Sequence, residues 1–386
     1  MHIYTFFVNN IIGDNMRKIK ADYYLLVLLF IMFIVSLLSL YNADLINGNV
    51  DNILIKQLVW YLIGFAFIFI ILYINNDLFI KYSLYFYILC NILLLLLLLF
   101  APTINGAKCW FKIKGLGTIQ ISEFTKIAII LFSAFLIPKI NDRNELKKDI
   151  KLLIYTLLIF IFPAILTFLE PDTGAVLMYL VIIFFILFTN KLRLRWYIFL
   201  ISTILIFASV SIFLYFNNLD LFLKLYGSDF FLRVERITNW INKDGMQLNN
   251  GITAIGIGGL FGSKLDIYFP EAHTDFIFAV FASKFGFIGS LSLLLVILLF
   301  DLRILHIYNQ TRKKENKIII IGILSVILYQ QIQNIGMTFG LLPITGITLP
   351  FISYGGSSLI SYMIMIGIIL NINNDNKKRR SIYRLI

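Results

Sequence analysis

The chain alternates between long apolar runs and short polar segments from Tyr24 to its last residues. A helix needs about 20 consecutive apolar residues to cross a bilayer. The pattern predicts about ten spans, which are Tyr24 to Tyr41, Gln57 to Ile74, Leu84 to Ala101, Glu123 to Ile137, Leu152 to Leu169, Gly174 to Thr189, Trp196 to Phe216, Phe276 to Phe300, Ile318 to Leu342 and Ser358 to Ile372. We therefore predict an all-α polytopic membrane protein.

The composition supports this class. Hydrophobic residues make up 60% of the chain, charged residues only 14%, and the mean hydropathy is +0.88, which excludes a soluble globular protein. Two cysteines, Cys90 and Cys109, and three histidines do not predict a disulfide framework or a metal centre built from these residue types.

The positive charge is concentrated in alternate connections between the spans. With a cytoplasmic N-terminus, segments 1–23, 75–83, 138–151, 190–195, 301–317 and 373–386 hold 22 of the 33 lysines and arginines. Cytoplasmic loops are enriched in these residues, so both termini are predicted to be cytoplasmic. The net charge of +12 then reflects topology, and no nucleic-acid partner is expected.

The expected organisation is a cytoplasmic tail (1–23), a single membrane domain (24–372) and a basic cytoplasmic tail (373–386). Met16 precedes a basic cluster and is an alternative start site. The large outer loop at 217–275, between the seventh and eighth spans, is the expected place for an extracytoplasmic function. Within it, apolar residues between Phe230 and Ile241 share one helical face, which predicts a helix lying in the membrane interface.

Charged residues within or beside the spans are costly in lipid and mark functional candidates. Glu123 and Lys126, three residues apart, share a helical face and can neutralise one another. Asp172 lies in a very short outer connection, where a solvated structural role is the alternative. Lys284 should face a polar cavity or a carboxylate.

The stretch Phe269 to Phe276 places two carboxylates and an imidazole at the start of an apolar helix. Asp275 has either a functional role or a plain helix-capping role. The segment Leu342 to Ser358 contains two prolines, three glycines and three serines, and irregular backbone at membrane depth is tolerated only beside protein or a water-filled cavity. A transporter and an enzyme acting on a lipid-borne substrate both fit these features.

The residues also resemble the SEDS family (shape, elongation, division and sporulation) of bacterial cell-wall polymerases, most closely its RodA branch. The matched pieces, in chain order, are Lys56-Gln57-Leu58-Val59-Trp60, Asn105-Gly106-Ala107-Lys108 with Trp110, Ser122-Glu123-Phe124-Thr125-Lys126, Pro171-Asp172-Thr173-Gly174, Ala254 to Gly262, Pro270 to Phe278, Gly286-Phe287-Ile288-Gly289, Asn334-Ile335-Gly336-Met337-Thr338 and Leu342 to Ser358. Asp172-Thr173-Gly174 and Met337-Thr338 favour the RodA branch, whereas Gly346 to Pro350 is more like the division and sporulation branches.

The resemblance implies a peptidoglycan glycosyltransferase that polymerises lipid II at the outer face of the bacterial cytoplasmic membrane during cell elongation. It implies that Asp275 is the general base. It further implies supporting or substrate-binding roles for other matched positions, namely Lys108, Trp110, Glu123, Lys126, Asp172, His273, Ser353, Gly355 and Ser357. A divalent cation such as Mg or Mn near Asp275, membrane lipid and a class B penicillin-binding transpeptidase are the expected cofactor and partners.

Three departures from the family pattern bear on activity. Ser283-Lys284 replaces two adjacent glutamates, Cys109 replaces an arginine beside Trp110, and the link between Gly262 and Pro270 is shorter than usual. The alternatives are a lipid II flippase, a polymerase of the division or sporulation branch (FtsW-like), and a non-catalytic scaffold. Clustering of the intramembrane charges towards the outer half favours the enzyme over the flippase.

Overall fold

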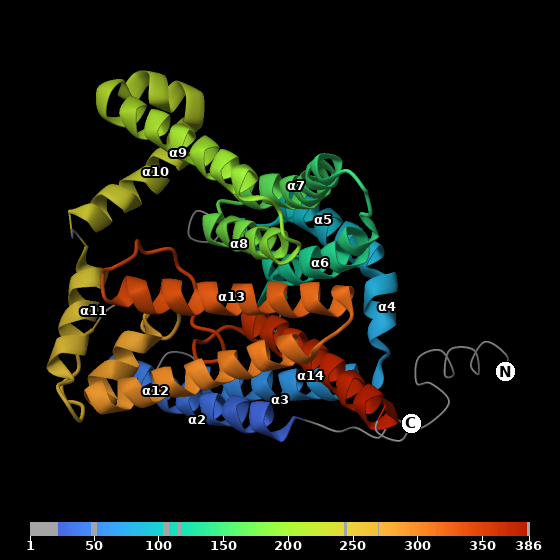
Figure 1. Cartoon of the computed structure of the whole chain (residues 1–386). Coiled ribbons are helices and arrows are strands. Elements are labelled where there is room, and N and C mark those ends of the chain that lie inside the picture. The colour runs from blue at the N-terminus through green and yellow to red at the C-terminus, as the bar shows by residue number, and fades with distance from the viewer. Residues whose placement is uncertain are drawn as a thin grey trace.

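The structure is a computed structural model that describes residues 22–47, 52–102, 108–113, 117–242, 245–268 and 270–383. Its helices and strands are α2 (Tyr23–Asn47), α3 (Ile53–Tyr73), α4 (Asn76–Lys81), α5 (Ser83–Phe100), β1 (Trp110–Ile113), β2 (Gly117–Gln120), α6 (Ile121–Leu136), η1 (Ile137–Lys139), α7 (Glu145–Leu169), α8 (Thr173–Thr189), α9 (Leu194–Asn217), α10 (Leu219–Ile241), α11 (Met246–Ile257), α12 (Ile277–Gln310), α13 (Lys314–Thr338) and α14 (Gly356–Tyr383) (Figure 1).

Each predicted span coincides with a helix, which confirms the polytopic membrane class. Among the described residues nine helices are long and apolar enough to cross a membrane, and α8 is a further apolar helix of 17 residues. The structure adds a short antiparallel pair, β1 and β2, in which Trp110 lies opposite Gln120. It also extends α14 to Tyr383, so the predicted basic tail begins as the last turns of this helix.

The core is built from close helix pairs, chiefly α3 with α14, α8 with α13, α2 with α12 and α5 with α6. Buried side chains at helical spacing fill these contacts, among them Tyr61, Ile68, Ile127, Ile130, Met178, Ile182, Ile319, Ile323, Tyr362 and Ile366. Outward-facing positions of the same helices carry exposed apolar residues such as Leu62 and Phe69, because a helix in lipid has no reason to be polar on its outer face.

Polar contacts at one end of the bundle join the start of α2 to α12 and α14. The guanidinium of Arg303 binds the carboxylate of Asp22 at 2.7 Å, and the Asn373 amide donates to the same carboxylate at 2.6 Å. In Figure 1, α4 and the end of α14 lie on this side and α11 lies on the opposite side. The first and last described residues therefore lie on one side of the bundle, and the cytoplasmic location of that side stays a prediction.

The large loop between α9 and α12 contains α10 and α11. The pair α9 and α10 projects from the bundle (Figure 1), and the indole of Trp240 ties the end of α10 to the carbonyl of Gly340 at 2.8 Å. The helix predicted between Phe230 and Ile241 is therefore confirmed as part of α10. Its location in the membrane interface stays a prediction.

The glycine pattern at the end of this loop allows two backbones to meet. Gly262 has a φ of +98°, and a Cβ there would lie 2.0 Å from the carbonyl oxygen of Lys284. Gly286 interrupts α12 with a φ of +65°, and its Cβ would lie 2.4 Å from the Gly262 nitrogen. Only glycine adopts this conformation at such close approach without strain.

The contact between the backbones around Gly262 and Gly286 also decides which partner the Lys284 ammonium meets. The Ser263 amide donates to the Ser283 carbonyl at 2.8 Å, and the Lys284 ammonium then pairs with the carboxylate of Asp266 at 2.5 Å. The expectation that Lys284 faces a polar cavity or a carboxylate is confirmed for the carboxylate. The shortened link between Gly262 and Pro270 supplies this partner.

We expect Gly286→Ala to destabilise the protein by about 2–4 kcal/mol, because the new Cβ would overlap the Gly262 backbone at an unfavourable φ. Gly256→Ala in α11 is the matched control, since no atom lies within 4 Å of its Cβ position; alanine there should stabilise the helix by up to about 1 kcal/mol. Thermal unfolding of the purified proteins in detergent measures both. Equal melting temperatures for the two variants would contradict the close contact.

Candidate functional site

A cavity of about 970 Å³ lies among α3, the β hairpin, α6, α8, the turn before α12 and the loop between α13 and α14. Its charged lining residues are Lys56, Lys112, Glu123, Asp172, Glu271 and Asp275. Two tryptophans, Trp60 and Trp110, and the glycine-rich start of α14 complete much of the wall. The irregular loop predicted to cover a polar cavity contributes Thr345 to Thr348 and Tyr354, as expected.

Asp275 belongs to a turn that precedes α12. Its side chain is buried, and the Thr274 hydroxyl lies 3.2 Å from its Oδ1 and 2.8 Å from Oε2 of Glu271. Burial raises the pKa of Asp275 to about 7, and the neighbouring Glu271 contributes in the same direction. The N-cap of α12 is Phe276, with no side-chain cap. The geometry therefore does not support a helix-capping role for Asp275.

The turn that contains Asp275 is held in place by hydrogen bonds to its backbone carbonyls. The Asn334 amide donates 2.8 Å bonds to the carbonyls of Asp275 and Ile347. The Ser353 hydroxyl donates to the Thr274 carbonyl at 2.5 Å, and the Tyr354 amide donates to the His273 carbonyl at 2.9 Å. The Asp275 turn and the loop after α13 thus form one unit.

Asp172 joins the hairpin to the start of α8. Its Oδ1 accepts from the Ala175 amide at 3.0 Å, which caps α8, and its Oδ2 accepts from Gln120 at 2.7 Å and Ser122 at 2.9 Å. Burial raises the pKa of Asp172, although these hydrogen bonds act in the opposite direction. Asp172 therefore has a structural role, because it caps α8, and it also lines the cavity.

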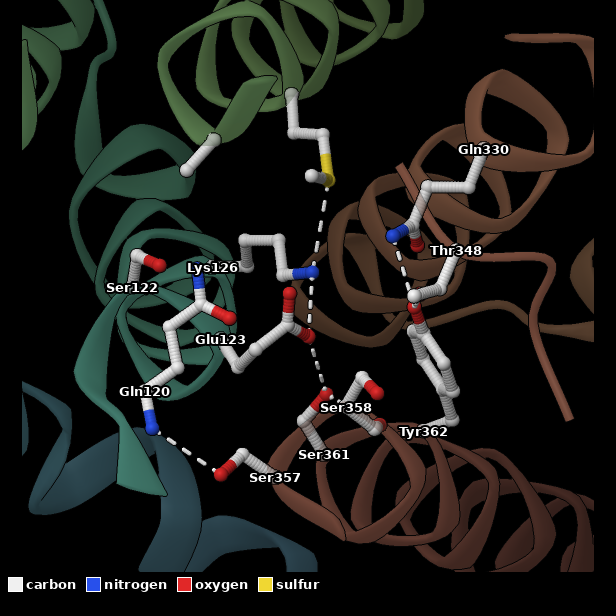
Figure 2. A network of polar contacts seen from close by, with 12 residues as sticks. Gln120, Ser122, Glu123, Lys126, Gln330, Thr348, Ser357, Ser358, Ser361 and Tyr362 are labelled. Carbon is white, nitrogen blue, oxygen red and sulfur yellow. Dashed lines mark hydrogen bonds and ion pairs between the residues drawn. The ribbon is translucent and has the colours of Figure 1, made fainter. Parts of the chain in front are cut away.

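Glu123 and Lys126 form the predicted ion pair at 2.7 Å, with Lys126 fully buried (Figure 2). The Ser361 hydroxyl donates to the same carboxylate oxygen at 3.0 Å. The ammonium lies 3.5 Å from the Met178 sulfur and 5.5 Å from the Tyr362 ring centre. Each charge is compensated, as a buried pair requires.

The same network reaches the cavity from two sides. Glu123, Thr348 and Gln330 line the cavity, and Gln330 donates to the Tyr362 hydroxyl at 2.8 Å. On the other side of the cavity, the backbone amide of Gln120 donates to the Ser357 hydroxyl at 3.1 Å, and this bond joins β2 to α14 (Figure 2). The ion pair and the hydrogen bonds around it form part of the cavity wall.

The structure brings most of the predicted site residues to one cavity. Those in its lining are Trp110, Glu123, Asp172, Asp275, Gly355 and Ser357. Four others lie outside the lining: Lys126 beneath Glu123, Ser353 beneath the Asp275 turn, Lys108 before β1, and the half-buried His273. The His273 Nδ1 has no partner among the described residues, and burial lowers the pKa of this imidazole. Asn105, Gly106 and Ala107 lie outside the described residues.

Cys109, which replaces an arginine of the family pattern, contacts Glu170, a residue with a buried carboxyl group. The Cys109 thiol donates to the Glu170 carbonyl at 2.7 Å. The Glu170 carboxyl is fully buried, and neither oxygen has a hydrogen-bond partner in the described structure. Burial, with a contribution from Asp172, raises the pKa of Glu170 to about 9, so this carboxyl is neutral at pH 7.

Sequence reasoning gave no site role to Lys56, Lys112, Glu271 or Asn334. Lys56 and Asn334 lie within matched motifs, and Glu271 is four residues before Asp275, so a signal existed for these three. Lys112 had none, because its place in the cavity follows from the hairpin. In the described ranges no group of three or more His, Cys, Asp or Glu residues could hold a metal ion. Glu271 and Asp275 could supply two carboxylate ligands, and the expected divalent cation stays a prediction.

Residues 18–378 match the FTSW_RODA_SPOVE family of cell cycle proteins, and the chain belongs to this family. It is 32% identical to the "Probable peptidoglycan glycosyltransferase FtsW" of Haemophilus ducreyi, over 83% of this chain and 79% of the relative. It is 31% identical to the "Peptidoglycan glycosyltransferase MrdB" of Helicobacter pylori, over 92% and 91%.

The fold resembles a chain in the solved structure "Structural coordination of polymerization and crosslinking by a peptidoglycan synthase complex", with a TM-score of 0.76 and 24% identity over 92% of this chain and 98% of that one. The family and the long apolar helices identify a multi-pass protein of the bacterial cytoplasmic membrane.

We expect single replacements Glu123→Ala and Lys126→Ala each to cost about 3–5 kcal/mol of stability, because each leaves a buried charge without its partner. The double variant should cost less than the sum of the two. Thermal unfolding and membrane yield of the four proteins complete the double-mutant cycle. Strictly additive losses would show that the two side chains act independently.

Proposed function

We propose that this chain polymerises lipid II into glycan strands at the outer face of the membrane, with Asp275 as the general base. The observation that carries this proposal is the Asp275 carboxyl, which is buried, lines a large cavity together with five other charged residues, and has a pKa raised to about 7. A base works best when its pKa is close to the operating pH. The names of the relatives, both peptidoglycan glycosyltransferases, support the reaction class.

The reaction is a single displacement at the anomeric carbon of the donor sugar. A hydroxyl oxygen of the acceptor sugar attacks that carbon, and the carbon–oxygen bond to the diphosphate breaks as the new one forms. The hydroxyl proton passes to the Asp275 carboxylate. The diphosphate leaves with its negative charge, which a cation must stabilise. This logic is that of an inverting glycosidase, with a sugar hydroxyl in place of water.

Glu271 and Asp275, bridged by the Thr274 hydroxyl, could hold a divalent cation together with substrate oxygens. Such an ion, when bound, would supply positive charge near the leaving group. Mg²⁺ in proteins commonly uses one or two carboxylates and completes its shell with phosphate oxygens and water. The two carboxylates therefore fit Mg²⁺ or Mn²⁺ only with the substrate present.

The flippase alternative has less support. The charged lining residues gather around one end of the bundle, and below them the facing sides of α6, α13 and α14 are closed by buried Ile127, Ile323 and Ile366. A role in elongation and pairing with a class B penicillin-binding transpeptidase are further parts of the proposal. The similar synthase complex, described as coordinating polymerization and crosslinking, supports the partner class.

Asp275→Asn should abolish polymerisation of labelled lipid II by the purified protein. The amide keeps the shape of the side chain but cannot accept the proton, so a loss of about 10²- to 10⁴-fold is expected. Asp266→Asn, on the outer loop and outside the cavity lining, is the matched control and should remain active. Near wild-type polymerisation by a well-folded Asp275→Asn protein would remove Asp275 from the reaction.

The rate should also depend on pH through Asp275. The carboxylate is the active form, so without added divalent cations, which would lower the pKa of Asp275, kcat/KM should fall about tenfold per pH unit below a pKa near 7 and level off above it. Initial rates of lipid II polymerisation between pH 5 and 9, with folding checked at each pH, measure this profile. A rate that stays constant down to pH 5 would contradict the raised pKa.

A further inference from the structure

Two lysines in the cavity wall have no partner among the described residues. Lys56 lies near the start of α3, and Lys112 lies in β1. Both side chains are exposed, and neither ammonium group forms an ion pair or hydrogen bond within the described part of the chain. Lys126, in contrast, is fully buried and already neutralised by Glu123. Of the lysines described in this wall, Lys56 and Lys112 are therefore available to an anionic ligand.

Neighbours of both lysines contact the first turn of α14. Trp60, one helical turn after Lys56, packs so closely on Gly356 that a Cβ there would lie 2.5 Å from the indole. Lys112 is the register partner of Thr118, whose carbonyl accepts from the Ser357 hydroxyl at 3.2 Å. The two elements that carry the lysines, α3 and the hairpin, thus both contact the start of α14.

The start of α14 adds to this positive site. Gly355, Gly356, Ser357 and Ser358 all line the cavity. The first amides of a helix have no partner within it, and the helix dipole favours an anion there. The helix terminus supports the site, and the two lysines define it.

An apolar strip continues from Lys56 along α3. Ile55, Val59 and Ile63 line the cavity, and Ile55 and Val59 are 64% and 44% exposed. Positions 56, 59 and 63 share one helical face. The protein therefore presents the charge of Lys56 followed by an apolar surface along α3. A polyprenyl diphosphate has a matching order of groups, an anionic diphosphate followed by a hydrocarbon chain.

We propose that Lys56 and Lys112 bind the diphosphate of the polyprenyl-linked sugar, with its hydrocarbon chain lying along Val59 and Ile63. The inference rests on the proposed function and deepens it, because it assigns the leaving-group end of the site. The lysines would stabilise the charge that develops on the departing diphosphate, while Asp275 in the same cavity takes the proton of the acceptor. Lys126 and Lys108 are not needed for this role.

The test measures binding of farnesyl diphosphate to the full chain in phosphatidylcholine nanodiscs, independently of polymerisation. The double variant Lys56→Gln/Lys112→Gln should bind about tenfold or more weakly, because charge-assisted hydrogen bonds are lost. Lys264→Gln, which removes an exposed outer lysine away from the cavity, is the matched control and should bind as wild type does. Lys56→Arg/Lys112→Arg keeps both charges and should retain binding within about threefold.

Wild-type affinity in the Gln double variant, or an equal loss in the Lys264 control, would overturn the assignment. Phosphatidylglycerol that competes as well as farnesyl diphosphate would also overturn it, since the site would then take any anionic headgroup. Because binding is measured without turnover, failure of lipid II polymerisation with intact lysine-dependent binding would refute the proposed function alone. Normal polymerisation with lysine-independent binding would refute this inference alone.

Discussion

The amide of Asn334 bonds two backbone carbonyls at once, those of Asp275 and Ile347, and the site depends on this bridge. The loop after α13 is irregular, so its carbonyls have no helical partners. In a membrane protein such groups must be satisfied from within the protein. Asn334 does this from a regular helix, where packing fixes its position. The two hydrogen bonds of Asn334 therefore satisfy a carbonyl of the loop and fix the position of the Asp275 turn relative to α13.

Most charges in and beside the bundle are compensated locally, and Asp275 is an exception. Glu123 has Lys126, Lys284 has Asp266, Asp22 has Arg303, and Asp172 has three hydrogen-bond donors. Among the described side chains, Asp275 receives the hydroxyl of Thr274 but no cation, and it lies near the acid of Glu271. An acid left this way in a buried position keeps its proton more readily, and so it can accept and release one near neutral pH.

The residues that departed from the family pattern fit the structure without disturbing the cavity. Lys284 points to the shortened link and pairs with Asp266 there. The Cys109 thiol donates to the backbone carbonyl of Glu170, whose carboxyl is buried and neutral. Neither Lys284 nor Cys109 lines the cavity. An active centre that retains Asp275, Glu123 and Asp172 is therefore compatible with all three departures.

The sequence by itself determined the spans, the Glu123–Lys126 pair and the need to cover the Leu342 to Ser358 loop. These features are local, because the length of an apolar run and a spacing of three residues decide them. Only the tertiary structure decided which residues share the cavity. Ser357 meets Thr118 across 239 positions and Asn334 meets Asp275 across 59. Such contacts depend on how helices pack. The family resemblance therefore named Lys108 and His273, which lie outside the cavity lining, and omitted Lys112, which the hairpin brings into it.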